Sequence, residues 1–109
     1  MNKPWRPTKE RGLVEARHML KRLRARRVPV TSVYLFGSLA KSNSHRWSDI
    51  DIAVVHEPFS ESRADERRTI RLLREHFDVP MDIVCLRTDD LENKCIGLAQ
   101  EVKRYGIAV

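Results

Sequence analysis

Apolar residues near the start of the chain recur at intervals of three and four positions, the spacing of one face of an α-helix. They are Leu13, Ala16, Leu20 and Leu23. Thr8 precedes them and suits an N-cap, and Pro29 cannot continue a helix. The pattern therefore predicts an amphipathic helix that begins at Thr8 and ends before Pro29.

Three later segments have the composition of β-strands. Residues 30–36 are rich in β-branched and aromatic side chains and stop at Gly37. Residues 49–55 (DIDIAVV) alternate between acidic and apolar side chains and continue with apolar ones before Pro58. A third short strand begins at about Met81. The apolar tail 107–109 suits a short edge strand.

Two further helices are predicted in the second half of the chain. Residues 62–77 are strongly charged but carry Ile70, Leu73 and Phe77 at helical spacing. After Thr88, a second apolar stripe runs to Gly106 as one continuous pattern. It consists of Leu91, Cys95, Leu98 and Val102. The order of elements predicts an α/β (α+β) fold, in which helices flank a mixed sheet of three to four strands.

Length and composition favour one compact domain over residues 1–109, with 1–7 as a flexible N-terminal segment. No run of about 18 apolar residues is present, and no apolar stretch follows the basic N-terminus. We therefore expect a cytoplasmic protein with no membrane contact. Cys85 and Cys95 lack metal-ligand spacing and are expected to be reduced thiols.

The chain is basic, with 21 Lys and Arg against 15 Asp and Glu, a net charge of +6 and a pI near 9.8. This balance favours anionic partners such as nucleotides, RNA or an acidic protein surface. Much of the charge lies within the first 27 residues. A solvated helix face is the favoured explanation there, and a nucleic-acid patch is the alternative.

Asp49 and Asp51 are the first candidates for chemistry. Because successive strand side chains point to opposite faces, these two carboxylates share one face while Ile50 and Ile52 occupy the other. Neighbouring carboxylates repel each other, and a bound cation removes that repulsion. Mg²⁺ prefers hard oxygen ligands, including one or two carboxylates together with substrate phosphates. The pair therefore predicts a magnesium site.

Gly37 and Ser38 follow the first predicted strand. A glycine there lets the backbone approach a phosphate, and a serine hydroxyl adds a donor. A Gly-Ser pair or an Asp-x-Asp pair alone is weak evidence. Together they fix four residue types, which chance would produce in a chain of this size with a probability on the order of 10⁻³.

The segment GSLAKSNSHRWSDIDIAVV resembles the signature of the polymerase-β-like nucleotidyltransferase superfamily, and within it the minimal nucleotidyltransferases. The resemblance extends over residues 13–109 and is most specific in 36–55. Asp82 in VPMDIVCL matches the further carboxylate that the family places on its third strand. The family often has Arg and Gly where this chain has Lys41 and Ser42.

The resemblance implies a role for each matching residue. Asp49, Asp51 and Asp82 would bind two Mg²⁺ ions, and Asp82 would also help to activate the acceptor. Gly37, Ser38 and Lys41 would bind the nucleotide, although lysine lacks the bidentate fork of arginine. His45, Arg46 and Trp47 in the predicted loop 42–48 are favoured for ordinary loop roles, and His18, His56 and His76 for surface positions.

The favoured function is a metal-dependent enzyme that moves a nucleoside monophosphate, AMP in the first instance, from ATP to a protein or RNA acceptor. The alternative is an antitoxin or partner subunit that binds a HEPN-domain protein, with or without catalysis. A basic RNA-binding module ranks third, because only 6% of residues are aromatic. Nucleobase, acceptor and oligomeric state are left open.

Overall fold

The computed structural model describes residues 8–41 and 49–109. The proposed flexible segment 1–7 and the loop 42–48, with its three candidate residues, lie outside this range. Helix α1 spans Lys9–Ala25, and the Thr8 hydroxyl accepts a hydrogen bond of 3.1 Å from the Arg11 amide. The predicted N-cap is confirmed.

The four strands within the described residues form one mixed sheet, as predicted. They are β1 (Val30–Phe36), β2 (Ile50–His56), β3 (Met81–Arg87) and β4 (Ile107–Ala108). The sheet order is β3-β2-β1-β4. β1 pairs antiparallel with β2 and β4, whereas β2 and β3 run parallel. The predicted edge strand is therefore present, and β3 forms the opposite edge.

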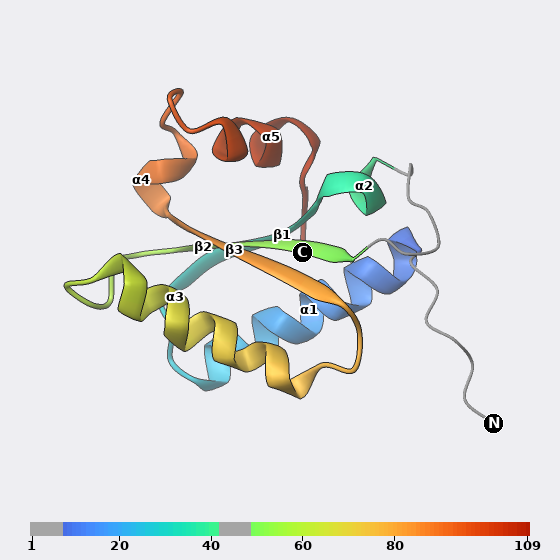
Figure 1. Cartoon of the computed structure of the whole chain (residues 1–109), viewed down its shortest axis with the longest axis horizontal. Helices are drawn as coiled ribbons and strands as arrows, with labels where there is room; N and C mark the ends of the chain where they lie inside the picture. The colour runs from blue at the N-terminus through green and yellow to red at the C-terminus, as the bar shows by residue number, and fades with distance from the viewer. Residues whose placement is uncertain (1–7, 42–48) are drawn as a thin grey trace.

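Helices cover both faces of this sheet (Figure 1). α1 and α3 (Arg63–Leu72, extended by the 3₁₀ turn η1, Leu73–His76) lie on one face. α4 (Thr88–Leu91) and α5 (Gly97–Tyr105) lie on the other. The short helix α2 (Gly37–Ala40) directly follows β1. No helix among the described residues is long and apolar enough to cross a membrane.

The prediction of one continuous helix from Thr88 to Gly106 was wrong. The chain leaves α4 at Glu92 and forms α5 only from Gly97. Asn93 makes the break, because its side-chain oxygen accepts from the Cys95 amide at 2.9 Å and its carbonyl accepts from the Ile96 amide at 3.1 Å. These local bonds compete with the helical pattern. Cys95 is consequently exposed.

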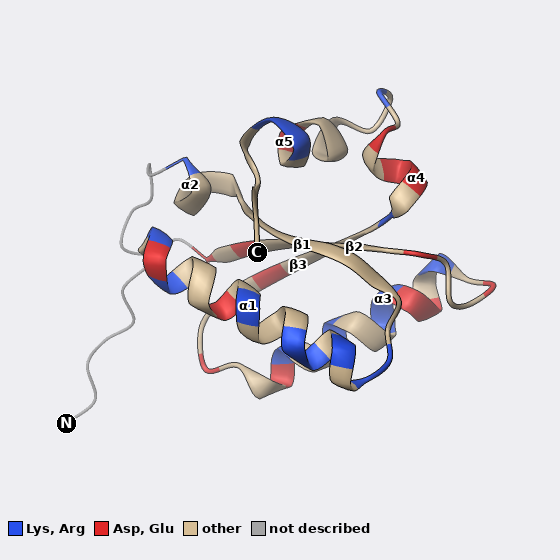
Figure 2. Ribbon diagram, turned by 180° about the vertical axis from the view of Figure 1, so that it is seen from behind, with Lys and Arg blue, Asp and Glu red and all other residues tan. Residues whose placement is uncertain are grey.

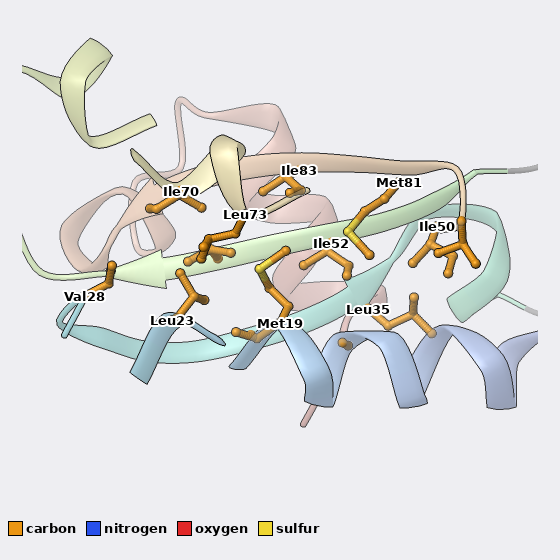
Figure 3. Packing of buried hydrophobic residues seen from close by; sticks show 14 of the residues in the cluster. Met19, Leu23, Val28, Leu35, Ile50, Ile52, Ile70, Leu73, Met81 and Ile83 are labelled. Atoms are coloured by element: carbon orange, nitrogen blue, oxygen red, sulfur yellow. The ribbon is translucent and has the colours of Figure 1, made fainter. Parts of the chain in front are cut away.

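Alternation along β2 divides the core into two layers. Ile50, Ile52 and Val54 face α1 and α3, where they join Met19 and Leu23 (Figure 3). Ala53 and Val55 point the other way, into a smaller cluster that contains residues of α5. Since Asp51 has the same parity as residues 53 and 55, it lies on the α4 and α5 face of the sheet.

His56 departs from the prediction of a surface histidine, because it is only 1% exposed. It ends β2, and its Nδ1 lies 2.9 Å from the carbonyl of Glu57. Its ring also packs against Phe59 with the centroids 5.2 Å apart. The turn after β2 folds over this side chain and removes it from solvent.

A buried carboxylate stabilises the same end of the sheet. Glu66 of α3 accepts hydrogen bonds from the amides of Phe59 and Ser60 and from Nε of Arg87, at 2.7, 3.0 and 2.9 Å. Burial alone would raise the pKa of Glu66, but these hydrogen bonds and the Arg87 charge lower it to about 2. Glu66 therefore remains ionised and connects α3, β3 and the turn.

Candidate active site

Asp51 and Asp82 stand side by side on neighbouring parallel strands. They are paired in the register of β2 and β3, each as the second residue of its strand. Adjacent strands lie about 4.8 Å apart, and paired side chains on parallel strands point to the same face. Asp51 is half-buried, and Asp82 is exposed. The two carboxylates thus share one end of the sheet.

Asp49 lies directly before β2 and is also exposed. Burial, and after it the negative charges of Asp82, Asp49 and Glu101 in that order, together raise the pKa of Asp51 to about 6. All three predicted carboxylates are therefore close enough to interact electrostatically. Glu101, on α5, is a fourth carboxylate in the same region.

Gly37 brings the end of β1 into direct contact with Asp51. Phe36 is paired with Asp51 across β1 and β2. Gly37 has a φ of +72°, and a Cβ built on it would lie 2.1 Å from Oδ2 of Asp51. Both the backbone conformation and the lack of space require glycine here. The predicted phosphate-binding turn is therefore adjacent to the predicted metal carboxylates.

The two other predicted nucleotide-binding residues belong to α2. Ser38 is its second residue, and Lys41 follows its last. The Lys41 ammonium lies 3.3 Å from Oε1 of Glu101 and 4.5 Å from the centre of the Tyr105 ring. Lys41 thus connects the Gly37 turn to α5, on the same face of the sheet as Asp51.

Sequence reasoning missed Glu101 and Tyr105. Both lie on α5, which was predicted as part of a longer helix, so nothing in the local pattern indicated which of its side chains faces Lys41. Tyr105 is 46% exposed, and Glu101 is partly exposed. The break at Asn93 sets the direction of α5, and that direction brings the two side chains to the site.

The carboxylates supply the oxygen ligands that a divalent cation prefers, but they do not form a complete coordination site. Within residues 8–41 and 49–109, no group of three or more His, Cys, Asp and Glu side chains is positioned to hold a metal ion. Asp51 and Asp82 nevertheless supply hard oxygen donors from adjacent strands, which Mg²⁺ prefers. Burial and then the neighbouring negative charges raise the pKa of Asp51, and a bound cation would neutralise those charges.

A family model described as "Nucleotidyltransferase domain" matches residues 17–106. The chain belongs to this nucleotidyltransferase family. The match spans the Gly37 turn, β2, β3 and α5, so it includes every element that carries a candidate site residue. The resemblance suggested by the Gly-Ser and Asp-x-Asp pattern is confirmed.

Solved toxin-antitoxin structures share the fold. A toxin-antitoxin structure with AMP-PNP is 28% identical, with a TM-score of 0.60 over 85% of this chain and 70% of that chain. A toxin-antitoxin MntA-HpeT mutant, in which two aspartates two positions apart are replaced by glutamate, is 27% identical, with a TM-score of 0.59 over 85% of this chain and 70% of that chain.

A putative nucleotidyltransferase from Sulfolobus solfataricus shares the fold at 21% identity. Its TM-score is 0.65, over 92% of this chain and 80% of that chain. No curated protein matches the chain. The predicted fold class, a mixed sheet flanked by helices, is therefore confirmed both by the structure and by its solved relatives.

Proposed function

We propose that this nucleotidyltransferase transfers AMP from ATP to a hydroxyl group of a protein or RNA acceptor, with two Mg²⁺ ions bound by Asp49, Asp51 and Asp82. The single observation that carries the proposal is the contact of Gly37 with Asp51, next to Asp82. It joins a backbone turn suited to phosphate with carboxylates suited to the cations that accompany a triphosphate.

In this proposal each residue has a defined task. The backbone at Gly37 and the Ser38 hydroxyl hold the triphosphate, and Lys41 contributes positive charge. Asp82 holds the attacking hydroxyl and draws away its proton while the oxygen bonds to the α-phosphorus and pyrophosphate leaves. Bound divalent ions would supply charge stabilisation for the attacking and leaving oxygens. The cytoplasmic location predicted from the sequence would supply ATP as the substrate.

Two solved relatives support the nucleotide and the aspartates. The toxin-antitoxin structure with AMP-PNP holds an analogue of ATP, which favours adenosine as the nucleoside. In the MntA-HpeT mutant, the replaced aspartates have the same spacing as Asp49 and Asp51. That spacing places two carboxylates on one face of a strand.

A partner-binding function is the second candidate. Two solved relatives are toxin-antitoxin assemblies, and the family resemblance implies a HEPN-type partner. An acceptor tyrosine on such a partner would unite both functions.

The test is an incubation with each of the four ribonucleoside triphosphates labelled at the α-phosphate, in Mg²⁺, with candidate proteins and RNAs as acceptors. Transfer of labelled AMP is expected from the wild type, and its loss from Asp51→Asn and Asp82→Asn. Asp65→Asn is the matched control, since Asp65 is an exposed acid on α3, which covers the face of the sheet opposite to the site. Full transfer by Asp51→Asn would contradict the metal assignment.

A further inference from the structure

Positive charge is concentrated on one of the two helical layers. Residues 9–27 contain eight Lys and Arg against two Glu, and residues 63–76 contain five Arg against three acids. These two segments hold thirteen of the 21 cations of the chain, so their net charge exceeds the +6 of the whole molecule. Figure 2 shows this charge along α1 and α3, on the face of the sheet opposite to α5.

The outer side of α3 and η1 bears a groove of about 510 Å³ within this layer. Its polar lining includes four arginines, Arg67, Arg68, Arg71 and Arg74, together with Glu75. Three of them, Arg67, Arg71 and Arg74, follow a spacing of four and three residues. Helical geometry therefore places these three guanidinium groups in one row.

Two of these arginines are held in place by the sheet edge. Nε of Arg71 donates to the carbonyl of Ile83 at 3.2 Å, and Nη1 of Arg74 donates to the carbonyl of Met81 at 3.4 Å. β3 is an edge strand, so these bonds cover carbonyls that have no neighbouring strand. Each guanidinium has five N–H donors, and most remain available to a ligand.

The other two arginines, Arg67 and Arg68, differ in their contacts with the rest of the protein. Arg68 makes an ion pair with Asp65 at 3.2 Å, and Asp65 is well exposed. Such a surface pair contributes little and is readily exchanged for another anion. Arg67 makes no hydrogen bond or ion pair with any described residue. The groove thus combines two fixed and two adaptable guanidinium groups.

The chemistry of the lining favours phosphate groups over an acidic protein. A protein interface normally contains an apolar core enriched in aromatic residues. This groove has one exposed large apolar side chain, Leu72, at 56%, and its lining contains no aromatic residue. Guanidinium groups instead match phosphate oxygens through their planar fork. The lack of aromatic rings also disfavours stacking on unpaired bases.

We propose that the groove on α3 and η1 binds the phosphate backbone of double-stranded RNA. Duplex RNA is recognised mainly through its shape and backbone, which requires a row of cations and no side chains that read bases. The site lies on the face opposite to the carboxylates, so it is independent of the proposed transfer reaction. Its ligand is a phosphodiester backbone held by Arg67, Arg68, Arg71 and Arg74.

The experiment measures binding of a fluorescent RNA duplex of about 16 base pairs to the full chain by anisotropy, across a series of NaCl concentrations. Arg67→Gln/Arg68→Gln is expected to weaken binding at least tenfold. It should also reduce the slope of log K against log[NaCl] by about 1 for each lost phosphate contact. Arg71→Lys/Arg74→Lys retains the charge but removes the fork, and a smaller loss is expected.

Lys94→Gln/Lys103→Gln removes the same charge from the opposite layer and should bind RNA like the wild type. Circular dichroism establishes that each variant is folded. Equal loss in this control and in Arg67→Gln/Arg68→Gln would overturn the groove as the site. Equal affinity for a DNA duplex would overturn the assignment to RNA, and equal competition by polyglutamate would overturn a nucleic-acid ligand. AMP transfer to a protein acceptor is expected to be unchanged in the arginine variants.

Discussion

Gly37 and Asp51 are in such close contact that even one methyl group on residue 37 would lie 2.1 Å from the Asp51 carboxylate. The contact joins the end of β1 to the beginning of β2. It places the turn proposed to bind phosphate and the carboxylate proposed to bind metal at the same point. A triphosphate and its cation would therefore be held by adjoining atoms of the protein.

Gly37→Ala should lower both stability and ATP binding. The positive φ of Gly37 costs an alanine about 1–2 kcal/mol, and the contact with Asp51 adds a steric cost. The measurements are a thermal melt and an ATP titration. Gly97→Ala is the control, because nothing lies within 4 Å of a Cβ at Gly97, and it should leave both properties unchanged or increase stability slightly. An unaltered melt for Gly37→Ala would contradict the contact.

Asp51→Asn should stabilise the metal-free protein more at pH 7 than at pH 4. The folded-state pKa of Asp51 is about 6, above the ordinary 3.8, so the folded protein binds the additional proton between these values. The contribution of Asp51 to the free energy of unfolding therefore falls as pH rises from about 4 to 6. The asparagine side chain of the variant does not ionise, so the variant avoids this loss of stability. With solvent screening of a half-exposed group, the gain is about 1 kcal/mol at pH 7.

Urea denaturation in EDTA at both pH values measures this difference. Asp65→Asn, on the exposed face of α3, should show no comparable change between the two pH values. A gain in stability for Asp51→Asn that is equal at pH 4 and pH 7 would show that ionisation of the Asp51 carboxyl is not its cause.

Mg²⁺ should raise the melting temperature of the wild type and have little effect on Asp51→Asn or Asp82→Asn. A ligand that binds only the folded state stabilises it in proportion to its occupancy. Because a carboxylate must lose its proton to bind a cation, the increase should be larger at pH 7.5 than at pH 5.5. Calorimetric scans with and without Mg²⁺ measure it. An equal increase in all three proteins would place the binding elsewhere.

Lys41→Ala and Glu101→Gln should change ATP affinity in opposite directions. The ion pair at 3.3 Å holds Lys41 toward α5, and Glu101 adds negative charge near Asp51. Loss of Lys41 removes a phosphate contact, whereas loss of the Glu101 charge releases the ammonium and reduces repulsion of the nucleotide. Isothermal titration with ATP is expected to give a several-fold change in each case. Equal weakening by both would indicate a structural role for the pair.

Glu66→Gln should destabilise the protein at neutral pH by about 3 kcal/mol, because it leaves Arg87 without its buried charge partner. The pKa of Glu66 is lowered to about 2, so its contribution is complete above 4.5 and is lost as pH falls toward 2. The free energies of unfolding of the wild type and the variant should therefore become similar in acid. Glu61→Gln, at an exposed position, is the matched control and should behave like the wild type.

Local patterns predicted much of the fold. Alternation and β-branched composition identified β1 over residues 30–36, and helical spacing with an N-cap identified α1 from Thr8. The spacing of Asp49 and Asp51 predicted that both side chains lie on the face of the strand opposite to Ile50 and Ile52. The division of the core into two layers along β2 confirms this for Asp51. These features depend on neighbouring residues, so a short window of sequence contains the required information.

The tertiary structure decided what local patterns do not contain. Asp82 meets Asp51 only because α3 returns the chain to lie parallel beside β2, and Glu101 reaches Lys41 only because Asn93 interrupts the predicted long helix. The position of Arg71 against the β3 edge likewise depends on packing between two elements, because its Nε donates to the carbonyl of Ile83. By itself, the sequence determined the chemical groups and their local faces. Packing between distant elements determined which groups meet, because strand order and helix direction are set by the shared core.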